Sequence, residues 1–194
     1  MGIGGQVALP PPGRAIFLDR DGVLNQTVLR TVKGKPGFGP PWSLDQLVIA
    51  PDAPASLARL AGAGFRLIVV TNQPDIARMD LERGTLAEIN AALHRALPML
   101  YRRFFVCMHD NADDCFCRKP KPGMLVSAAA QFGLDLSACY MVGDRAKDVE
   151  AGHNAGCRTV WIKAVGHNEP GPARPAHHEA QSLTEATDWI LASE

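Results

Sequence analysis

Short apolar runs alternate along the chain with stretches whose apolar residues are spaced as in helices. Five apolar runs end in polar or turn residues, as buried strands do, at 15–18, 65–70, 104–107, 139–142 and 157–162. Five further stretches have the apolar spacing or the end signals of helices, at 51–63, 85–97, 122–132, 144–154 and 183–191. This alternation predicts an α/β fold with three layers, α/β/α, in which helices cover both faces of a Rossmann-like parallel sheet.

Other segments have neither pattern. Residues 1–13 are rich in glycine and proline and are expected to form a flexible arm. Residues 26–50 are irregular, with glycine and proline concentrated at 33–42, and a loop of this length in a compact domain is usually a lid or a binding loop. Because this segment follows a pair of acidic residues, we interpret it as a flap rather than a disordered insertion. It is too short to be a large cap domain, so residues 1–194 are expected to form a single domain.

The composition argues against several classes of function. The 194 residues are 46% hydrophobic and 21% charged with a formal net charge of zero, which disfavours a broad nucleic-acid or membrane surface. Only 6% are aromatic, whereas a zinc-stabilised nucleic-acid-binding module, an alternative from another class, would have a basic face with interleaved aromatic residues. The chain has neither a bilayer-spanning apolar run nor the pattern of a signal peptide. We therefore expect a cytoplasmic protein, either a monomer or a small homo-oligomer.

Polar residues follow three of the predicted strands. Asp19 and Asp21 come directly after the first strand, Thr71 follows the second, and Asp144 follows the fourth. The carboxyl ends of parallel strands meet at one edge of a sheet, so we expect these residues to converge. Their carboxylates are hard oxygen ligands that suit Mg²⁺, and the Thr71 hydroxyl can donate a hydrogen bond to a phosphate oxygen.

A lysine supplies the cation that such a site needs. Lys119 lies in the sequence Arg-Lys-Pro-Lys-Pro-Gly, whose prolines keep it at the mouth of the next helix, and it can neutralise a phosphate as a point charge. Each feature alone has an equally good plain explanation, such as a turn at Asp21, a turn cap at Thr71 or a solvated helix face at Asp148. All of them in this order predict a phosphoryl-transfer site.

These motifs, between residues 15 and 162, resemble those of the haloacid dehalogenase superfamily of aspartate-nucleophile phosphatases. The resemblance implies that Asp19 attacks phosphorus and forms an aspartyl-phosphate. It implies that Asp21 protonates the leaving alcohol and then activates water. It also implies that Mg²⁺ is bound by Asp19, Asp144 and the backbone carbonyl of Asp21.

The same resemblance gives roles to the remaining polar residues. Thr71 and Lys119 would hold the transferring phosphoryl group. We expect Asp148 to orient Lys119 or to support the metal shell. The expected substrate is a small phosphorylated metabolite.

A cluster of possible zinc ligands lies within residues 107–117. It consists of Cys107, His109, Cys115 and Cys117. Three thiols and one imidazole match a closed, structural Cys₃His zinc site, which would fix the loop that presents Lys119. The alternative is four unrelated residues on a loop, with Cys107 packed as a small core residue. The other cysteines, Cys139 and Cys157, fall in predicted strands and are expected to be buried thiols.

The zinc loop and the Cys-x-Cys-Arg-Lys-Pro-Lys-Pro-Gly sequence narrow the resemblance to one branch of the superfamily. They are similar to the branch that contains the heptose-bisphosphate phosphatases and the histidinol-phosphate phosphatases. In that branch the residue matching Arg118 contributes to substrate recognition, and we expect Asn72 and Gln73 to contact substrate as well. The leading expectation is a Mg²⁺-dependent sugar-bisphosphate phosphatase. A histidinol-phosphate phosphatase, or an enzyme acting on another small sugar phosphate, is the alternative.

The sequence departs from the heptose enzymes at three places. Thr-Val-Leu-Arg stands at 27–30 where those enzymes usually have Asp-His-Gly-Tyr, Pro-Asp stands at 74–75 in place of Ser-Gly, and Arg145 replaces a lysine. These changes leave the chemistry intact and bear on the choice of substrate. We hypothesise that Arg30, with Lys33 and Lys35, binds a second phosphate on the substrate.

Overall fold

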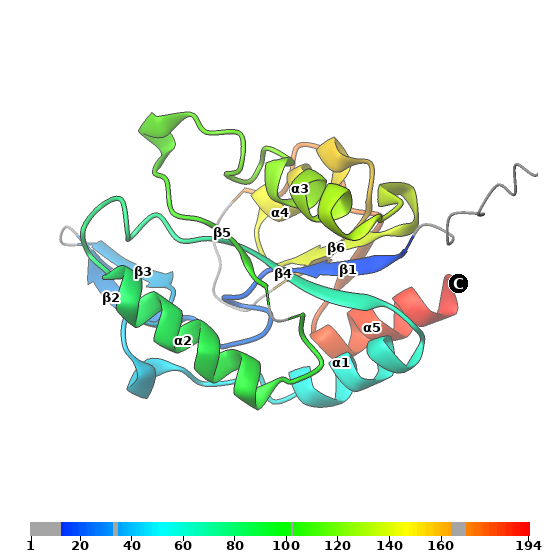
Figure 1. The fold of residues 1–194 in the computed structure, drawn as a ribbon, viewed down its shortest axis with the longest axis horizontal. Helices are drawn as coiled ribbons and strands as arrows, with labels where there is room; N and C mark the ends of the chain where they lie inside the picture. The colour runs from blue at the N-terminus through cyan, green and yellow to red at the C-terminus, as the bar shows by residue number, and fades with distance from the viewer. Residues whose placement is uncertain (1–12, 33–34, 102, 164–169) are drawn as a thin grey trace, which may run out of the picture.

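The computed structural model describes residues 13–32, 35–101, 103–163 and 170–194. Its centre is a six-stranded sheet in the order β5-β4-β1-β6-β7-β8, in which all neighbouring strands are parallel (Figure 1). The strands are β1 (Ala15–Leu18), β4 (Arg66–Asn72), β5 (Phe105–Cys107), β6 (Tyr140–Gly143), β7 (Arg158–Ile162) and β8 (His178–Ala180). The predicted parallel α/β sheet is therefore confirmed.

Helices cover both faces of this sheet. The α-helices are α1 (Ala53–Gly62), α2 (Arg83–Ala96), α3 (Gly123–Phe132), α4 (Ala146–Ala155) and α5 (Leu183–Ala192). Short 3₁₀ helices lie at Leu44–Gln46, Asn111–Asp113 and Leu136–Ala138. Figure 1 shows α3 and α4 on one side of the sheet and α1 and α5 on the other.

Alternation along β1 explains the two cores. Ile16 and Leu18 belong to the core cluster that includes residues of α1 and α5, whereas Ala15 and Phe17 belong to the cluster that includes residues of α3 and α4. Successive side chains of a strand point to opposite faces, so a strand without polar residues needs cover on both sides. All four residues of β1 are fully buried, which confirms the three-layer architecture.

The segment predicted to be an irregular flap contains a hairpin. β2 (Val28–Val32) pairs antiparallel with β3 (Lys35–Gly39), and Leu29 lies opposite Phe38. The prediction of irregular structure was wrong for these residues. Glycine, proline and charged residues interrupt the alternation of apolar and polar residues by which a strand is recognised in a sequence. In addition, β2 and β3 are held by pairing with each other rather than by burial in the core. Leu29 is 63% exposed.

Two further differences concern strand ends. β4 continues through Thr71 and Asn72, which pair with Val106 and Cys107 of β5, so both residues belong to the sheet rather than to the following turn. His178–Ala180, which none of the predicted helices or strands includes, forms the edge strand β8 against β7. An edge strand this short carries too few apolar residues to be detected from the sequence. The predicted flexible arm falls outside the described residues, except for Gly13.

Among the helices that the structure describes, none has the length and the apolar character required to span a lipid bilayer.

Candidate active site

The ends of β4, β1 and β6 bring together the residues that the sequence analysis assigned to one edge. Asp19 follows β1 and Asp144 follows β6, and the backbone N–H of Asp19 donates to the Val142 carbonyl over 3.0 Å. Thr71 lies at the end of β4, on the other side of β1. Because β4, β1 and β6 are neighbours, the carboxyl ends of these strands meet at one edge, as expected for a ligand site in an open parallel sheet.

The Lys119 ammonium group lies at the centre of this edge. Its Nζ is 2.9 Å from Asp19 Oδ1 and 2.7 Å from Asp148 Oδ1, and it donates to the Val70 carbonyl over 2.8 Å. The Lys119 side chain is completely buried, so all three of its N–H groups need these acceptors. The contact with Asp148 agrees with the expectation that Asp148 orients Lys119.

The charges of this cluster support one another. Burial alone would lower the pKa of Lys119, but the carboxylates of Asp148 and Asp19 outweigh it, and the pKa of Lys119 is raised. Burial raises the pKa of Asp19, but the Lys119 ammonium outweighs this effect, so the pKa of Asp19 is lowered. Asp19 is therefore held as a carboxylate, which is the form able to attack phosphorus.

Asp144 completes a group of three acids. Carboxylate oxygens of Asp19, Asp144 and Asp148 lie within 4.8 Å of one another. Burial and the neighbouring Asp19 and Asp148 raise the pKa of Asp144 well above its usual range. Three buried carboxylates within this distance form a donor set that fits a divalent cation, because such cations prefer oxygen ligands.

The side chain of Asp21 lies in a separate network. Its carboxylate accepts hydrogen bonds from Arg20 Nε at 3.1 and 3.2 Å, from Asn25 Nδ2 at 3.0 Å and from Gln73 Nε2 at 2.7 Å. Gln73 Nε2 also donates to Thr71 Oγ1 over 2.9 Å, so it links Asp21 to Thr71. Sequence reasoning assigned no role to Arg20, which is fully buried; its only signal was its position between the two acids.

The side-chain amide of Asn72 makes two hydrogen bonds to the backbone of Lys119. Its Nδ2 donates to the Lys119 carbonyl over 3.0 Å, and its Oδ1 accepts from the Lys119 N–H over 3.1 Å. Both ends of the amide thus hold the lysine in place. The structure gives Asn72 a positioning role, and a direct contact with substrate remains a prediction.

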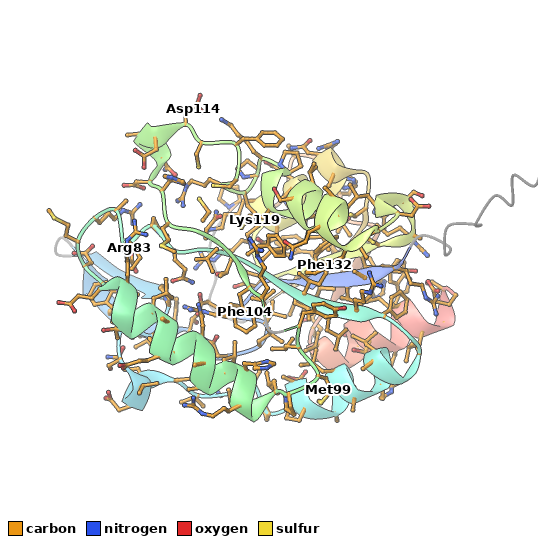
Figure 2. All side chains as sticks on the ribbon, in the orientation of Figure 1. Arg83, Met99, Phe104, Asp114, Lys119 and Phe132 are labelled. Carbon is orange, nitrogen blue, oxygen red and sulfur yellow. The ribbon has the colours of Figure 1, made fainter. Side chains whose placement is uncertain are left out.

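The predicted zinc ligands lie together, Cys107 at the end of β5 and the other three on the loop between β5 and α3. Cys107 Sγ is 3.6 Å from Cys115 Sγ, and Cys117 Sγ is 3.4 Å from Cys115 Sγ. His109 Nδ1 is 3.7 Å from Cys107 Sγ and 3.3 Å from Cys117 Sγ. Figure 2 shows Asp114 at the outer tip of this loop and Lys119 nearer the middle of the molecule.

Two predicted substrate contacts are partly engaged with protein groups. Arg118 donates from Nε to Asn111 Oδ1 over 2.8 Å and from Nη1 to the His109 carbonyl over 3.1 Å, so its side chain lies along the cysteine loop. Arg30 donates from Nη2 to the Pro40 carbonyl, and its guanidinium carbon is 4.0 Å from the centroid of the Trp42 ring. Lys33 and the side chain of Lys35 lie outside what the structure describes.

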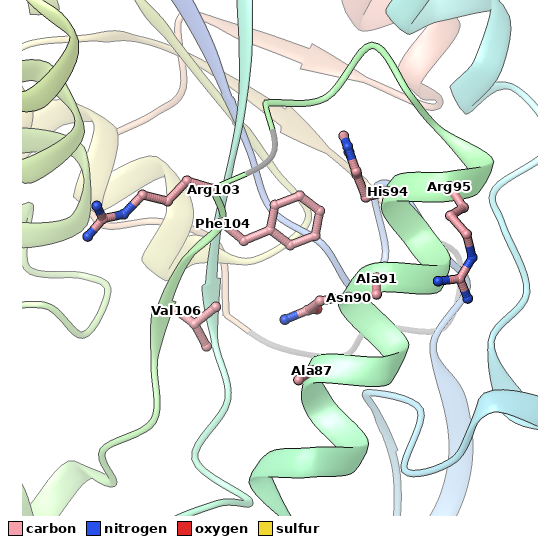
Figure 3. A pocket seen from close by; sticks show the side chains of 8 residues that line it. All are labelled: Ala87, Asn90, Ala91, His94, Arg95, Arg103, Phe104 and Val106. Atoms are coloured by element: carbon pink, nitrogen blue, oxygen red, sulfur yellow. The ribbon is translucent and has the colours of Figure 1, made fainter.

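A pocket of about 700 Å³ lies between α2 and β5, away from these residues. Figure 3 shows Asn90 and Phe104 among the side chains that line it, and none of the predicted site residues does so. Asn90 Oδ1 accepts a hydrogen bond from Arg20 Nη1 over 2.8 Å, which is a connection between this pocket and the Asp21 network. The reactive groups themselves lie at the strand ends.

Comparison with known proteins agrees with this arrangement. A family model described as haloacid dehalogenase (HAD) hydrolase-like matches residues 116–186. The chain is 35% identical over 157 residues to the D-glycero-beta-D-manno-heptose-1,7-bisphosphate 7-phosphatase of Bordetella bronchiseptica, covering 79% of this chain and 82% of that protein. The corresponding enzyme of Pseudomonas aeruginosa is 34% identical over 151 residues, which cover 76% of this chain and 80% of the relative. The chain belongs to the haloacid dehalogenase-like phosphatases.

A solved structure extends this result to nearly the whole chain. The crystal structure of D,D-heptose 1,7-bisphosphate phosphatase from B. bronchiseptica, complexed with magnesium and phosphate, matches with a TM-score of 0.76 and 28% identity, covering 94% of this chain and 99% of that chain. The chain is therefore an enzyme, a phosphoric monoester hydrolase, and the family resemblance seen in the motifs is confirmed.

Gly22 offers a test of the geometry of this phosphatase site. It has a φ of +89°, and a Cβ added to it would lie 2.3 Å from Asp144 Oδ2. We expect Gly22→Ala to lower kcat by about 100-fold, because a displacement of about 1 Å at a reacting group costs that much. Steady-state phosphate release measures the loss.

Gly84→Ala is the matched control, since a Cβ there meets nothing within 4 Å, and it should keep the wild-type kcat. A Gly22→Ala variant with wild-type kcat and unchanged dependence on Mg²⁺ concentration would show that the close approach to Asp144 is unimportant.

Proposed function

We propose that this phosphatase is a Mg²⁺-dependent D-glycero-β-D-manno-heptose-1,7-bisphosphate 7-phosphatase that works through an aspartyl-phosphate. The main support is the buried Lys119 ammonium, which lies 2.9 Å from Asp19 beside two further carboxylates. This arrangement keeps a nucleophilic carboxylate charged and provides ligands for a divalent cation. The substrate rests on the names of the similar enzymes from Bordetella and Pseudomonas.

The residues divide the reaction into two displacements. Asp19 attacks phosphorus, a bond forms between its carboxylate oxygen and phosphorus, and the bond to the sugar oxygen breaks. Asp21 gives a proton to that oxygen, and in the second step it takes a proton from the water that releases phosphate. Gln73, which donates to both Asp21 and Thr71, holds the acid beside the phosphoryl site.

Lys119 and Thr71 contribute charge and hydrogen bonds to the transferring group. The Lys119 ammonium and the Thr71 hydroxyl are placed to bind phosphoryl oxygens while the group passes to Asp19. Asp19, Asp144 and the backbone carbonyl of Asp21 would hold Mg²⁺, which when bound neutralises charge on the phosphoryl oxygens. We propose Arg118 and Gln73 as further substrate contacts.

A substrate panel tests this function. We expect the wild-type enzyme with Mg²⁺ to release phosphate from D-glycero-β-D-manno-heptose 1,7-bisphosphate with a higher kcat/KM than from the α-anomer or from histidinol phosphate. Asp19→Asn should lower kcat by at least about 1,000-fold, because a carboxamide is not a nucleophile. Asp45→Asn, at an exposed position, is the control and should be unaffected.

The opposite ranking would change the assignment. If kcat/KM were higher for histidinol phosphate, the enzyme would be assigned as a histidinol-phosphate phosphatase, whose leaving group is an amino alcohol rather than a sugar. Substantial turnover by Asp19→Asn would rule out the aspartyl-phosphate.

We propose that Cys107, His109, Cys115 and Cys117 bind a structural Zn²⁺. Tetrahedral zinc with Zn–S bonds of about 2.3 Å places two sulfurs about 3.8 Å apart, close to the 3.6 and 3.4 Å between the sulfurs here. Burial and the neighbouring thiols raise the pKa of Cys117 to about 12, so thiolates at this spacing need a cation. None of the five cysteines, all of which the structure describes, is in a disulfide. We propose a reducing cytoplasmic location, where thiols stay available as zinc ligands.

Removing one ligand tests the zinc site. Cys117→Ser should reduce bound zinc from about one per chain and lower the melting temperature, because metal binding stabilises the folded state. Elemental analysis and thermal unfolding provide the measurements. Cys157→Ala, at a buried thiol outside the cluster, should keep its zinc even if it is less stable; full zinc retention by Cys117→Ser would exclude this ligand set.

We propose that Arg30 binds the second phosphate of the substrate. Its Nη1 is buried and has no hydrogen-bond partner among the described residues, so one donor remains for a ligand. Both Nη groups of a guanidinium suit a phosphate, and here only Nη2 is used by the Pro40 carbonyl.

Removing the charge of Arg30 should affect KM for one of two substrates and not the other. Arg30→Gln is expected to raise KM for the heptose 1,7-bisphosphate by about tenfold and to leave KM for the 7-phosphate unchanged, because only the former has the second phosphate. Steady-state kinetics on both substrates measures this, with Arg95→Gln, an exposed α2 residue, as control. An equal change in both KM values would end this role for Arg30.

A further inference from the structure

The hydrogen bond between Trp42 and Asp75 joins the flap to the loop after β4. We infer that Asp75 and Trp42 are positioning residues that hold Arg30 at the mouth of the active site and thereby set the preference for a substrate with a second anionic group. This inference rests on the proposed function. It concerns positions where the sequence differs from the heptose enzymes, since Asp75 stands where they usually have glycine.

Asp75 is a buried carboxylate with one close partner. It is only 7% exposed, and its Oδ2 accepts a hydrogen bond from Trp42 Nε1 over 2.7 Å. A carboxylate this buried must be compensated by donors or by charge. A further neighbour, Arg78, lies 3.7 Å from the Asp75 carboxylate and makes a closer, two-pronged pair with Asp110 at 2.9 and 2.6 Å. The indole of Trp42 is the hydrogen-bond donor to the Asp75 carboxylate among the described residues.

Trp42 in turn supports Arg30. The indole is fixed by Asp75, and the backbone N–H of Trp42 donates to Gln46 Oε1 over 2.9 Å. The guanidinium carbon of Arg30 lies 4.0 Å from the centroid of the Trp42 ring, a distance at which a planar cation and an aromatic face attract each other. A fixed ring therefore fixes the plane of the guanidinium.

The charge of two carboxylates acts on the Arg30 guanidinium. Burial lowers the pKa of Arg30, and the carboxylates of Asp75 and Asp21 oppose this effect. Its Nη1 is buried without a hydrogen-bond partner among the described residues. A donor that is held in place and kept from other partners costs less to order when an anion binds, which is the advantage of a preorganised site.

The loop after β4 contacts both the catalytic acid Asp21 and the flap. Gln73 donates to Asp21, and two residues later Asp75 accepts from Trp42. On the other side of the edge, Arg145 Nη2 donates to the Phe38 carbonyl of β3 over 3.3 Å. The flap is thus fixed both to the loop after β4 and to the start of α4. We infer that these two attachments keep Arg30 in a constant position relative to Asp19 and Asp21.

Three variants separate positioning from mere stability. Trp42→Phe keeps an aromatic face but loses the N–H donor, Asp75→Ala loses the acceptor, and Asp75→Asn keeps an acceptor oxygen for the indole. If Asp75 and Trp42 position Arg30, Trp42→Phe and Asp75→Ala each raise KM for the heptose 1,7-bisphosphate about tenfold. KM for the 7-phosphate and both kcat values stay within about twofold of wild type, and Asp75→Asn resembles wild type.

The double variant Asp75→Ala/Trp42→Phe should be no worse than either single variant, because both remove the same hydrogen bond. An equal rise in KM for both substrates would overturn the inference, since it would mean that the pair only stabilises the flap. Additive losses in the double variant, or an Asp75→Asn variant as impaired as Asp75→Ala, would overturn it too.

A spectroscopic readout is independent of the substrate. The chain has three tryptophans, so ¹H–¹⁵N spectra show three indole N–H signals, and the one missing in Trp42→Phe identifies Trp42. That signal should move upfield in Asp75→Ala and stay nearly in place in Asp75→Asn; an unmoved signal in Asp75→Ala overturns the inference. If the wild-type enzyme hydrolyses neither heptose substrate, the proposed function fails, and the KM ratio is measured with fructose 1,6-bisphosphate and fructose 6-phosphate.

Discussion

The buried ammonium of Lys119 constrains the whole catalytic edge. A lysine without exposure to water must give each N–H an acceptor, and here Asp19, Asp148 and the Val70 carbonyl are those acceptors. Removing one partner of a buried ion pair leaves an uncompensated charge and costs about 3–5 kcal/mol. Val70 lies in β4, Asp19 follows β1, and Asp148 lies in α4, which begins shortly after β6. These three strands must therefore be neighbours, and the order β4-β1-β6 satisfies this requirement.

Two separate devices fix the backbone that carries this lysine. The amide of Asn72 bonds to both the N–H and the carbonyl of Lys119, which ties the segment to the end of β4. Two residues earlier, Cys117 belongs to the cysteine and histidine cluster, which with the proposed zinc bound would tie the same segment to β5 through Cys107. A loop with only one short 3₁₀ helix, Asn111–Asp113, thus gains fixed points on adjacent strands. This explains how a side chain from a loop can be positioned as firmly as one from the sheet.

The sequence was sufficient to predict five of the six strands of the sheet and its reactive edge, because buried parallel strands consist of apolar runs and Asp19, Thr71 and Asp144 follow such runs. The hairpin and the edge strand β8 were missed, since neither has the apolar run that burial imposes. The hydrogen bonds of Asn72 and Asp75 were beyond sequence reasoning for another reason. Their partners are 47 and 33 residues away, and no local pattern records which polar groups tertiary packing brings together.

The flap differs from the catalytic edge in what holds it. Its hairpin exposes Leu29 at 63% and Phe38 at 41%, so hydrophobic burial contributes little to the hairpin. At the end of the flap, by contrast, Leu47, Ile49 and Ala50 pack against the core. Polar contacts at Trp42 and at the Phe38 carbonyl hold the rest of the flap. Such hydrogen bonds fix the geometry of the flap but contribute little to the free energy of unfolding. Residues around them can therefore change without unfolding the core. In the proposed function, chemistry is confined to the buried strand ends, whereas the rest of the substrate is recognised by the flap and the loop after β4, where the sequence differs from the heptose enzymes at 27–30 and 74–75.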